Sequence, residues 1–214
     1  MNELTLREEI VAVAQAIDKA GFCPSKSGNV SARFGDGFLI TPSGLPYAKT
    51  RPQDLIYLSL DGAVLSGERK PSSEWPFHVA IYKARPDAQA IVHTHSPRAT
   101  ALSCARRGIP AFHYMIALCG GADVRCADYA TFGSPELAEN AVRALDGRKA
   151  VLLANHGVIA LGASLAGART IVAEVENLAG QYLDLLAAGL EPVILDAAEM
   201  VRVSAKFAGY GKVG

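Results

Sequence analysis

Short apolar runs that end abruptly in polar turn residues constrain the fold of this chain more than any other feature. The segment KAVLLANHGVIALG, residues 149–162, contains two such runs, separated by Asn155, His156 and Gly157. Runs of this length bounded by turn residues predict short buried strands. A further run, AIVHTH at residues 90–95, also ends in polar residues and predicts another strand. These strands require other elements to cover them.

Segments with helical spacing alternate with the strands. The clearest helix has Ser134 as its cap and Pro135 in the first position, and Gly147 follows its end. Helices are predicted over residues 3–20, 73–85, 97–107, 134–147, 164–188 and 196–207, and short hairpins around residues 35–37 and 61–62. The segment 110–121 fits a strand or a short helix. This alternation predicts one α/β domain over residues 1–214, with helices covering a mixed sheet whose strand order the pattern does not reveal.

Composition excludes several classes of partner. The chain has 214 residues, half of them hydrophobic, and 21 basic residues balance 21 acidic ones. A neutral chain predicts no binding to nucleic acid or to an anionic membrane. We see no signal peptide and no apolar run long enough to span a bilayer, and the four cysteines form no C-x-x-C pair. We therefore expect a cytoplasmic protein.

Two of the five histidines occupy alternate positions at the end of one strand. In a strand, His93 and His95 project from the same face, so they can bind one metal ion or simply bond to each other. His156 ends another buried strand, and Glu74 stands at a helix start. Three imidazoles and one carboxylate suit zinc, with Glu74 able to leave the metal and act as an acid or base. Apolar walls around Glu74 would raise its pKa.

His78 competes with this ligand set. It follows Glu74 by four residues and therefore shares its helical face. Spacing alone allows a metal ligand, a partner that orients a ligand, or a half-buried helix histidine.

Three turns rich in glycine and hydroxyl groups are candidates for anion binding. Each offers backbone N–H and hydroxyl donors, although each alone is also an ordinary turn. They are Ser27-Gly28-Asn29, Thr41 to Gly44, and Ser72-Ser73. No Walker loop or dinucleotide fingerprint accompanies them, which argues against an NTPase or a dehydrogenase.

These motifs, in this order, resemble the class II aldolase/adducin superfamily over nearly the whole chain. The resemblance includes SGNVSARFGDGFLITPSGLPY, PSSEWPFH, AIVHTH, NHGVIA and the tail KFAGYG. PAFHYMIALCGGADVRCADYATFG is similar to the L-fuculose-1-phosphate aldolase branch. The implied fold is a three-layer α/β/α sandwich with a central mixed, largely antiparallel sheet.

The resemblance also implies roles for individual residues. It implies one zinc ion per subunit, bound by Glu74, His93, His95 and His156. The substrate phosphate would contact Gly28, Asn29, Ser43, Gly44, Ser72 and Ser73. Tyr114 would be the acid/base at the aldehyde oxygen, and Tyr210 and Phe132 would shape the aldehyde end. Tyr114 and Tyr210 would reach a neighbouring subunit, which implies a homotetramer with active sites at subunit interfaces.

The implied reaction is reversible cleavage of a ketose 1-phosphate to dihydroxyacetone phosphate and an aldehyde. The substrate would be L-fuculose 1-phosphate or a related pentulose, 5-deoxy- or 5-methylthiopentulose 1-phosphate. Zinc would stabilise the charge that forms as the C3–C4 bond breaks, and Glu74 would return a proton to carbon. Alternatives in the superfamily are L-ribulose-5-phosphate 4-epimerase, methylthioribulose-1-phosphate dehydratase, a tetronate-phosphate decarboxylase and a non-enzymatic adducin-like module. Lys26 departs from the threonine of the family and either pairs with the phosphate or points to solvent.

Overall fold

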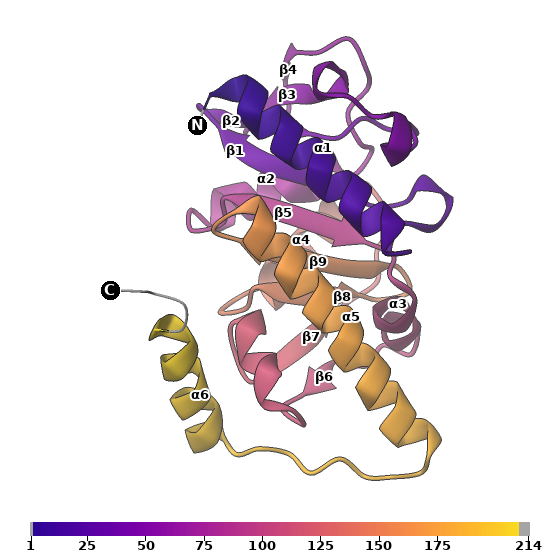
Figure 1. Ribbon diagram of the computed structural model, residues 1–214, viewed down its shortest axis with the longest axis vertical. Helices are drawn as coiled ribbons and strands as arrows, with labels where there is room; N and C mark the ends of the chain where they lie inside the picture. Colours follow the sequence, from indigo (N-terminus) through magenta and orange to yellow (C-terminus); the bar gives the residue numbers. More distant parts are fainter. Residues whose placement is uncertain (1, 210–214) are drawn as a thin grey trace.

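One mixed sheet runs through the computed structural model, which describes residues 2–209 (Figure 1). Its strand order is β4-β3-β2-β1-β5-β9-β8-β7-β6, and every neighbouring pair is antiparallel except β7 with β8. The strands are β1 (Asn29–Phe34), β2 (Gly37–Ile40), β3 (Ile56–Ser59), β4 (Val64–Ser66), β5 (Ala90–Thr94), β6 (Ile109–Pro110), β7 (Asp123–Ala127), β8 (Ala150–Leu153) and β9 (Gly157–Gly162). The sheet is thus mixed and largely antiparallel.

Helices cover both faces of this sheet. They are α1 (Glu3–Lys19), α2 (Trp75–Ala84), α3 (Pro97–Cys104), α4 (Pro135–Ala144), α5 (Leu165–Ala187) and α6 (Ala197–Gly209). Short 3-10 turns are η1 (Pro24–Lys26), η2 (Tyr47–Lys49), η3 (Pro52–Asp54) and η4 (Tyr114–Cys119). In Figure 1, α1 and α5 lie in front of the sheet, and α2 and α4 lie behind it.

The strands divide their side chains between two buried apolar layers. On β9, Val158 and Ala160 join the layer under α1, α3 and α5, whereas Ile159 and Leu161 join the layer under α2 and α4. Successive strand side chains point to opposite faces, so a fully apolar strand needs cover on both. The three-layer α/β/α fold is therefore confirmed.

The predicted elements occur close to their expected positions. The ambiguous segment at 110–121 contains the end of β6 and then η4. Strand β7 had no prediction, because its sequence DVRCA mixes charged and apolar residues. It is the strand that pairs in parallel with β8, next to the short edge strand β6.

Helix α6 stands apart from the other helices in Figure 1, at the end of an extended segment that follows α5. It contacts η4 most closely. Among the described residues, no helix combines the length and apolar character needed to cross a membrane.

Strand registers bring distant residues to one end of the sheet. Asn29 begins β1 opposite His93 near the end of β5, and Thr94 lies opposite Val158 at the start of β9. The turn between β8 and β9, which contains His156, is therefore at the same end. Glu74 joins them because it immediately precedes α2, which covers that face.

Candidate functional site

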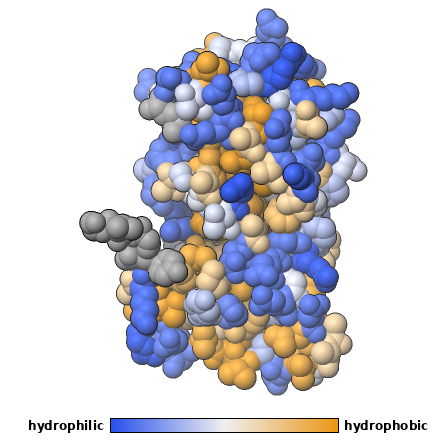
Figure 2. All heavy atoms as spheres, in the orientation of Figure 1, coloured by the Kyte–Doolittle hydropathy of each residue, from blue (hydrophilic) through white to orange (hydrophobic). Residues whose placement is uncertain are grey.

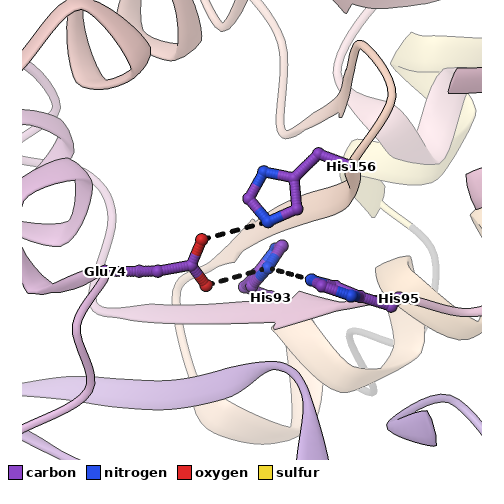
Figure 3. A group of neighbouring side chains, drawn as sticks. All are labelled: Glu74, His93, His95 and His156. Atoms are coloured by element: carbon purple, nitrogen blue, oxygen red, sulfur yellow. Dashed lines mark hydrogen bonds and ion pairs between the residues drawn. The ribbon is translucent and has the colours of Figure 1, made fainter. Parts of the chain in front are cut away.

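Four side chains point toward one another at this end of the sheet (Figure 3). Glu74, His93, His95 and His156 each offer one ligand atom, and these atoms lie within 4.8 Å of one another. His93 Nε2 is 3.2 Å from Glu74 Oε2 and 3.0 Å from His95 Nε2, and His156 Nε2 is 3.0 Å from Glu74 Oε1. The structure therefore brings together all four predicted metal ligands.

Backbone geometry holds these ligands in place. His93 is fully buried near the end of β5, and its Nδ1 is 2.9 Å from the carbonyl oxygen of Val158 on β9. Because that oxygen only accepts, His93 Nδ1 carries the proton and Nε2 faces the cluster. Gly157 follows His156, and a Cβ there would come within 2.4 Å of the Thr94 carbonyl oxygen. Only glycine allows the β8–β9 turn to approach β5 this closely.

The donor chemistry of the cluster fits a divalent cation. His93 Nε2 approaches both a carboxylate oxygen and another imidazole nitrogen, but it can carry only one hydrogen. One hydrogen cannot serve both contacts, whereas one cation placed among the four groups would accept every lone pair. Three imidazole nitrogens and a carboxylate are ligands of zinc and of similar transition metals.

Electrostatics inside the cluster correct one expectation about Glu74. Burial does raise the pKa of its carboxyl, but positive charge and hydrogen bonds at His93 and His156 outweigh burial, so the pKa lies well below its usual range. Burial, aided by His93 and His156, lowers the pKa of His95 to about 3. Both side chains are thus held in the deprotonated forms that bind metal.

His78 is outside the ligand set. It is fully buried, with Nδ1 2.7 Å from Ser31 Oγ and Nε2 2.5 Å from Asn29 Oδ1. The Asn29 amide in turn contacts Glu74. Of the three interpretations that spacing allowed, the structure favours a residue acting on a ligand through a neighbour.

A cavity of about 310 Å³ opens beside the cluster. Its walls combine ligand residues with hydroxyl and glycine residues from all three predicted turns. The lining includes Gly28, Ser43, Gly44, Ser72, Ser73, Glu74, His95, Phe132 and His156. Asn29 is not among the lining residues, since it is buried behind the wall with its amide bonded to Ser72 and Glu74.

Local backbone contacts assemble the three turns. An isolated antiparallel bridge pairs Pro42 with Pro71. The Ser43 N–H donates to the Lys70 carbonyl oxygen and the Ser72 N–H to the Thr41 carbonyl oxygen, so the bridge joins the 41–44 turn to the segment that holds Ser72. At Gly28, φ is +86°, and a Cβ would approach the His93 carbonyl oxygen to 2.6 Å. A glycine is therefore required where this turn crosses the end of β5.

Tyr129 and Asn155 also line the cavity, although the sequence assigned them no role. Lys26, for which the sequence left either a phosphate contact or a position facing solvent, lines it as well. Tyr129 lies within the YATFG segment and Asn155 directly precedes His156, so both neighbour recognised motifs. Lys26 is exposed, with φ at +66°, and is the one cationic side chain among the described lining residues.

Tyr114, the predicted acid/base, does not line this cavity. Tyr114 begins η4, is 51% exposed, and stacks on Phe207 of α6. It lines a separate, mainly apolar cavity of about 1000 Å³ between η4 and α6. Tyr210 lies outside the described residues.

Comparison with known proteins identifies a family. Residues 8–183 match the model described as Class II Aldolase and Adducin N-terminal domain. A 5-methylthioribulose-1-phosphate/5-deoxyribulose-1-phosphate aldolase from Rhodospirillum rubrum is 49% identical over 98% of this chain and 94% of its own length. An L-fuculose phosphate aldolase from Escherichia coli is 44% identical over 99% of this chain and 98% of its own.

A solved structure shares the fold. The structure of an L-fuculose 1-phosphate aldolase superimposes with a TM-score of 0.92 and 41% identity, covering 95% of this chain and 96% of that one. These matches confirm the predicted superfamily and the predicted enzyme class, a lyase of the aldolase type.

Proposed function

The chain belongs to the class II aldolase and adducin family, and on that premise we propose that it cleaves a ketose 1-phosphate reversibly to dihydroxyacetone phosphate and an aldehyde. The observation that carries the proposal is the cavity that joins the Glu/His cluster to three anion-binding turns. A sugar phosphate needs both features, one at its carbonyl end and one at its phosphate. Relatives named for 5-methylthioribulose, 5-deoxyribulose and L-fuculose phosphates indicate the substrate class.

We propose zinc as the cofactor, held by Glu74, His93, His95 and His156. When bound, it would act as a Lewis acid on the negative charge that develops as the C3–C4 bond breaks. The phosphate would accept hydrogen bonds from the Ser43, Ser72 and Ser73 turns and from backbone N–H groups at Gly28 and Gly44.

Glu74 is the proposed proton carrier at carbon. Its carboxylate is buried at the boundary between the cluster and the cavity, so it can exchange a proton with a substrate seated there. Phe132, 66% exposed at the cavity rim, would contact the aldehyde half.

Tyr114 would exchange a proton with the oxygen that becomes the aldehyde, in the cavity of a neighbouring subunit. Two observations support this role: the Tyr114 side chain is half exposed, and it does not line the metal cavity of its own chain. Figure 2 shows apolar atoms gathered on the lower half of the face, where Figure 1 places η4, β6 and the segment before α6. Such a surface suits subunit contacts, and we propose a homotetramer to which Tyr210 also contributes.

The test measures dihydroxyacetone phosphate released from a panel of ketose 1-phosphates, with and without a chelator. The panel contains the L-fuculose, D-ribulose, 5-deoxyribulose and 5-methylthioribulose 1-phosphates. We expect release that stops with the chelator and returns with zinc. Failure of every substrate would overturn the aldolase, and interconversion of pentulose 5-phosphates without free triose phosphate would identify an epimerase instead.

A further inference from the structure

From the buried contacts around Glu74 we infer that His78 is a positioning residue, which fixes the orientation of the Asn29 side-chain amide. That amide in turn orients the Glu74 carboxylate of the metal cluster and the Ser72 hydroxyl of the anion-binding wall. The inference deepens the proposed function and rests on it for the identity of the two bound species, the metal ion and the substrate phosphate. Its structural basis lies in His78 and Asn29, which do not line the cavity, although Asn29 contacts residues that do.

The contacts form one buried chain behind the site. Tyr82 Oη is 2.8 Å from Ser31 Oγ, which is 2.7 Å from His78 Nδ1. His78 Nε2 is 2.5 Å from Asn29 Oδ1. Asn29 Nδ2 then lies 2.9 Å from Glu74 Oε2 and 3.0 Å from Ser72 Oγ. All are buried, with at most 6% exposure.

Hydrogen-bond rules give this chain a direction. The carboxylate of Glu74 only accepts, so the Asn29 group facing it must be the NH2. The Asn29 oxygen therefore faces His78 and requires an N–H there, at Nε2. A neutral imidazole then accepts at Nδ1, so Ser31 donates to it, and Tyr82 donates to Ser31.

The imidazole of His78 remains neutral, which preserves this direction. Burial lowers its pKa to about 3, with positive charge at His93 acting in the same sense. The ring is packed between Phe77 and Phe38, with centroid separations of 4.6 and 6.3 Å. It therefore presents one fixed donor to Asn29.

Asn29 transmits this orientation to both parts of the site. Its two amide hydrogens serve Glu74 Oε2 and Ser72 Oγ. The reverse amide orientation would place the Asn29 carbonyl oxygen against the Glu74 carboxylate. Glu74 Oε2 and Ser72 Oγ would then receive no hydrogen bond from Asn29. Loss of the His78 donor removes the contact that holds the Asn29 oxygen, and leaves the amide orientation fixed only from the side of Glu74 and Ser72.

Ser72 receives a defined role from this arrangement. Its oxygen accepts from Asn29 Nδ2 and from the Glu74 backbone N–H, at 3.0 and 3.3 Å. Both acceptor positions are then occupied, so the hydroxyl hydrogen remains available as a donor. Because Ser72 lines the cavity, that donor serves an anion rather than the protein.

The experiment measures binding rather than turnover. Co²⁺ affinity is determined by competition with a chelator, and affinity for inorganic phosphate by calorimetry on the metal-loaded protein. Variants are His78→Phe, which keeps an aromatic ring but no donor, and His78→Gln, whose amide can donate to Asn29. Tyr82→Phe is the matched control, because it removes a buried hydroxyl at the far end of the chain.

We expect His78→Phe to weaken Co²⁺ binding roughly 10- to 100-fold, as removal of groups that orient metal ligands does, and to weaken phosphate binding as well. His78→Gln should recover part of both losses. Tyr82→Phe should lower Tm yet bind both probes as wild type does. Should His78→Phe fold poorly, Ser31→Ala, which removes the donor to Nδ1, should give a smaller loss of the same kind.

Unchanged binding of both probes by folded His78→Phe would overturn the inference, as would equal losses in Tyr82→Phe. Wild-type protein that binds both probes but cleaves no ketose phosphate would refute the proposed function instead. In that case the same variants still test the coupling of the two sites.

Discussion

The metal end of the sheet and the region formed by η4 and α6 differ in almost every physical respect. At the metal end, polar side chains such as Asn29, His78 and Glu74 are buried and bond to one another across different parts of the same chain. In the η4–α6 region, apolar side chains such as Tyr114 and Val201 are exposed at 51% and 69%. One region is complete within the chain, whereas the other exposes surface that a partner can cover.

This contrast explains how one active site can draw on two kinds of structure. Metal ligands and their supports must be held with little freedom, which strand ends and buried hydrogen bonds achieve. A group that acts on the outgoing aldehyde can come from a neighbouring subunit, because it needs only to reach the cavity mouth.

Loss of a metal ligand should have the largest effect on the rate of cleavage. His95→Ala removes one ligand, and we expect cleavage to fall on the order of 10³-fold or more, because a Lewis acid contributes several kcal/mol to such a transition state. The measurement is the rate of dihydroxyacetone phosphate release. Zinc added after chelation should restore the wild type but not the variant. Equal activity of the two proteins would contradict the assigned ligand set.

Tyr114→Phe tests the other region and should lower kcat by about 10²- to 10⁴-fold, the usual range for a general acid or base. Zinc content should stay at the wild-type value, because the hydroxyl lies outside the metal cavity. Metal analysis and steady-state kinetics on one preparation give both readings. Full activity would remove Tyr114 from the mechanism.

Mixing the two variants sharpens the comparison. If the site joins two chains, subunits of His95→Ala and Tyr114→Phe that are unfolded and reassembled together should regain activity. Random assortment predicts roughly a quarter of the sites intact. Activity that stays at the level of the separate variants would place both residues in one chain's site, or Tyr114 in none.

Acid sensitivity should be concentrated at the metal end. The folded-state pKa of His78, about 3, lies below the unfolded value of about 6.5. Its contribution to stability is therefore complete above pH 6.5 and is lost as the pH falls toward 3. Between these values the wild type should lose up to about 1.4 kcal/mol per pH unit more than His78→Gln. Urea unfolding at several pH values, with chelator present, measures the difference, and parallel slopes would contradict it.

Lys26→Met should have the smallest effect. Lys26 is exposed at the cavity wall, so screening limits its attraction for a phosphate to about 1 kcal/mol or less. We expect KM to rise by no more than about fivefold, with kcat unchanged. A rise that vanishes at high salt would agree with an ionic contact, and an unchanged KM at low salt would show that the lysine points to solvent.

Much of the fold was accessible from local pattern. Two apolar runs around Asn155, His156 and Gly157 predict β8 and β9, and cap and stop residues predict α4. The helix predicted over residues 164–188 matches α5 closely. Strand β7 was missed because Asp123 and Arg125 interrupt its apolar residues and its parallel partner is distant in sequence. Strand β7 is stabilised by its pairing with β8, and the strand propensity of its own residues does not predict that pairing.

The chemical groups of the site were also recognisable from residue type. His93 and His95 at alternate positions of a strand, with His156 after another, indicate a metal site before any coordinates exist. The role of His78 could not be decided from the sequence. Its separation of four residues from Glu74 is compatible both with a metal ligand and with a residue that orients a ligand. Its contact with Asn29 arises from packing α2 against β1, across 49 residues of chain.

By itself, the sequence determined most of the helices and strands, though not β7, and which atoms are available to bind a metal and an anion, because periodicity and side-chain chemistry are local properties. Tertiary structure alone decided that Asn29 lies behind the cavity wall, that His78 supports rather than binds, and that Tyr114 lies apart from the metal. Each of these depends on register between strands or on packing between layers. Those long-range contacts are set by the energy of the whole fold and not by any segment of it.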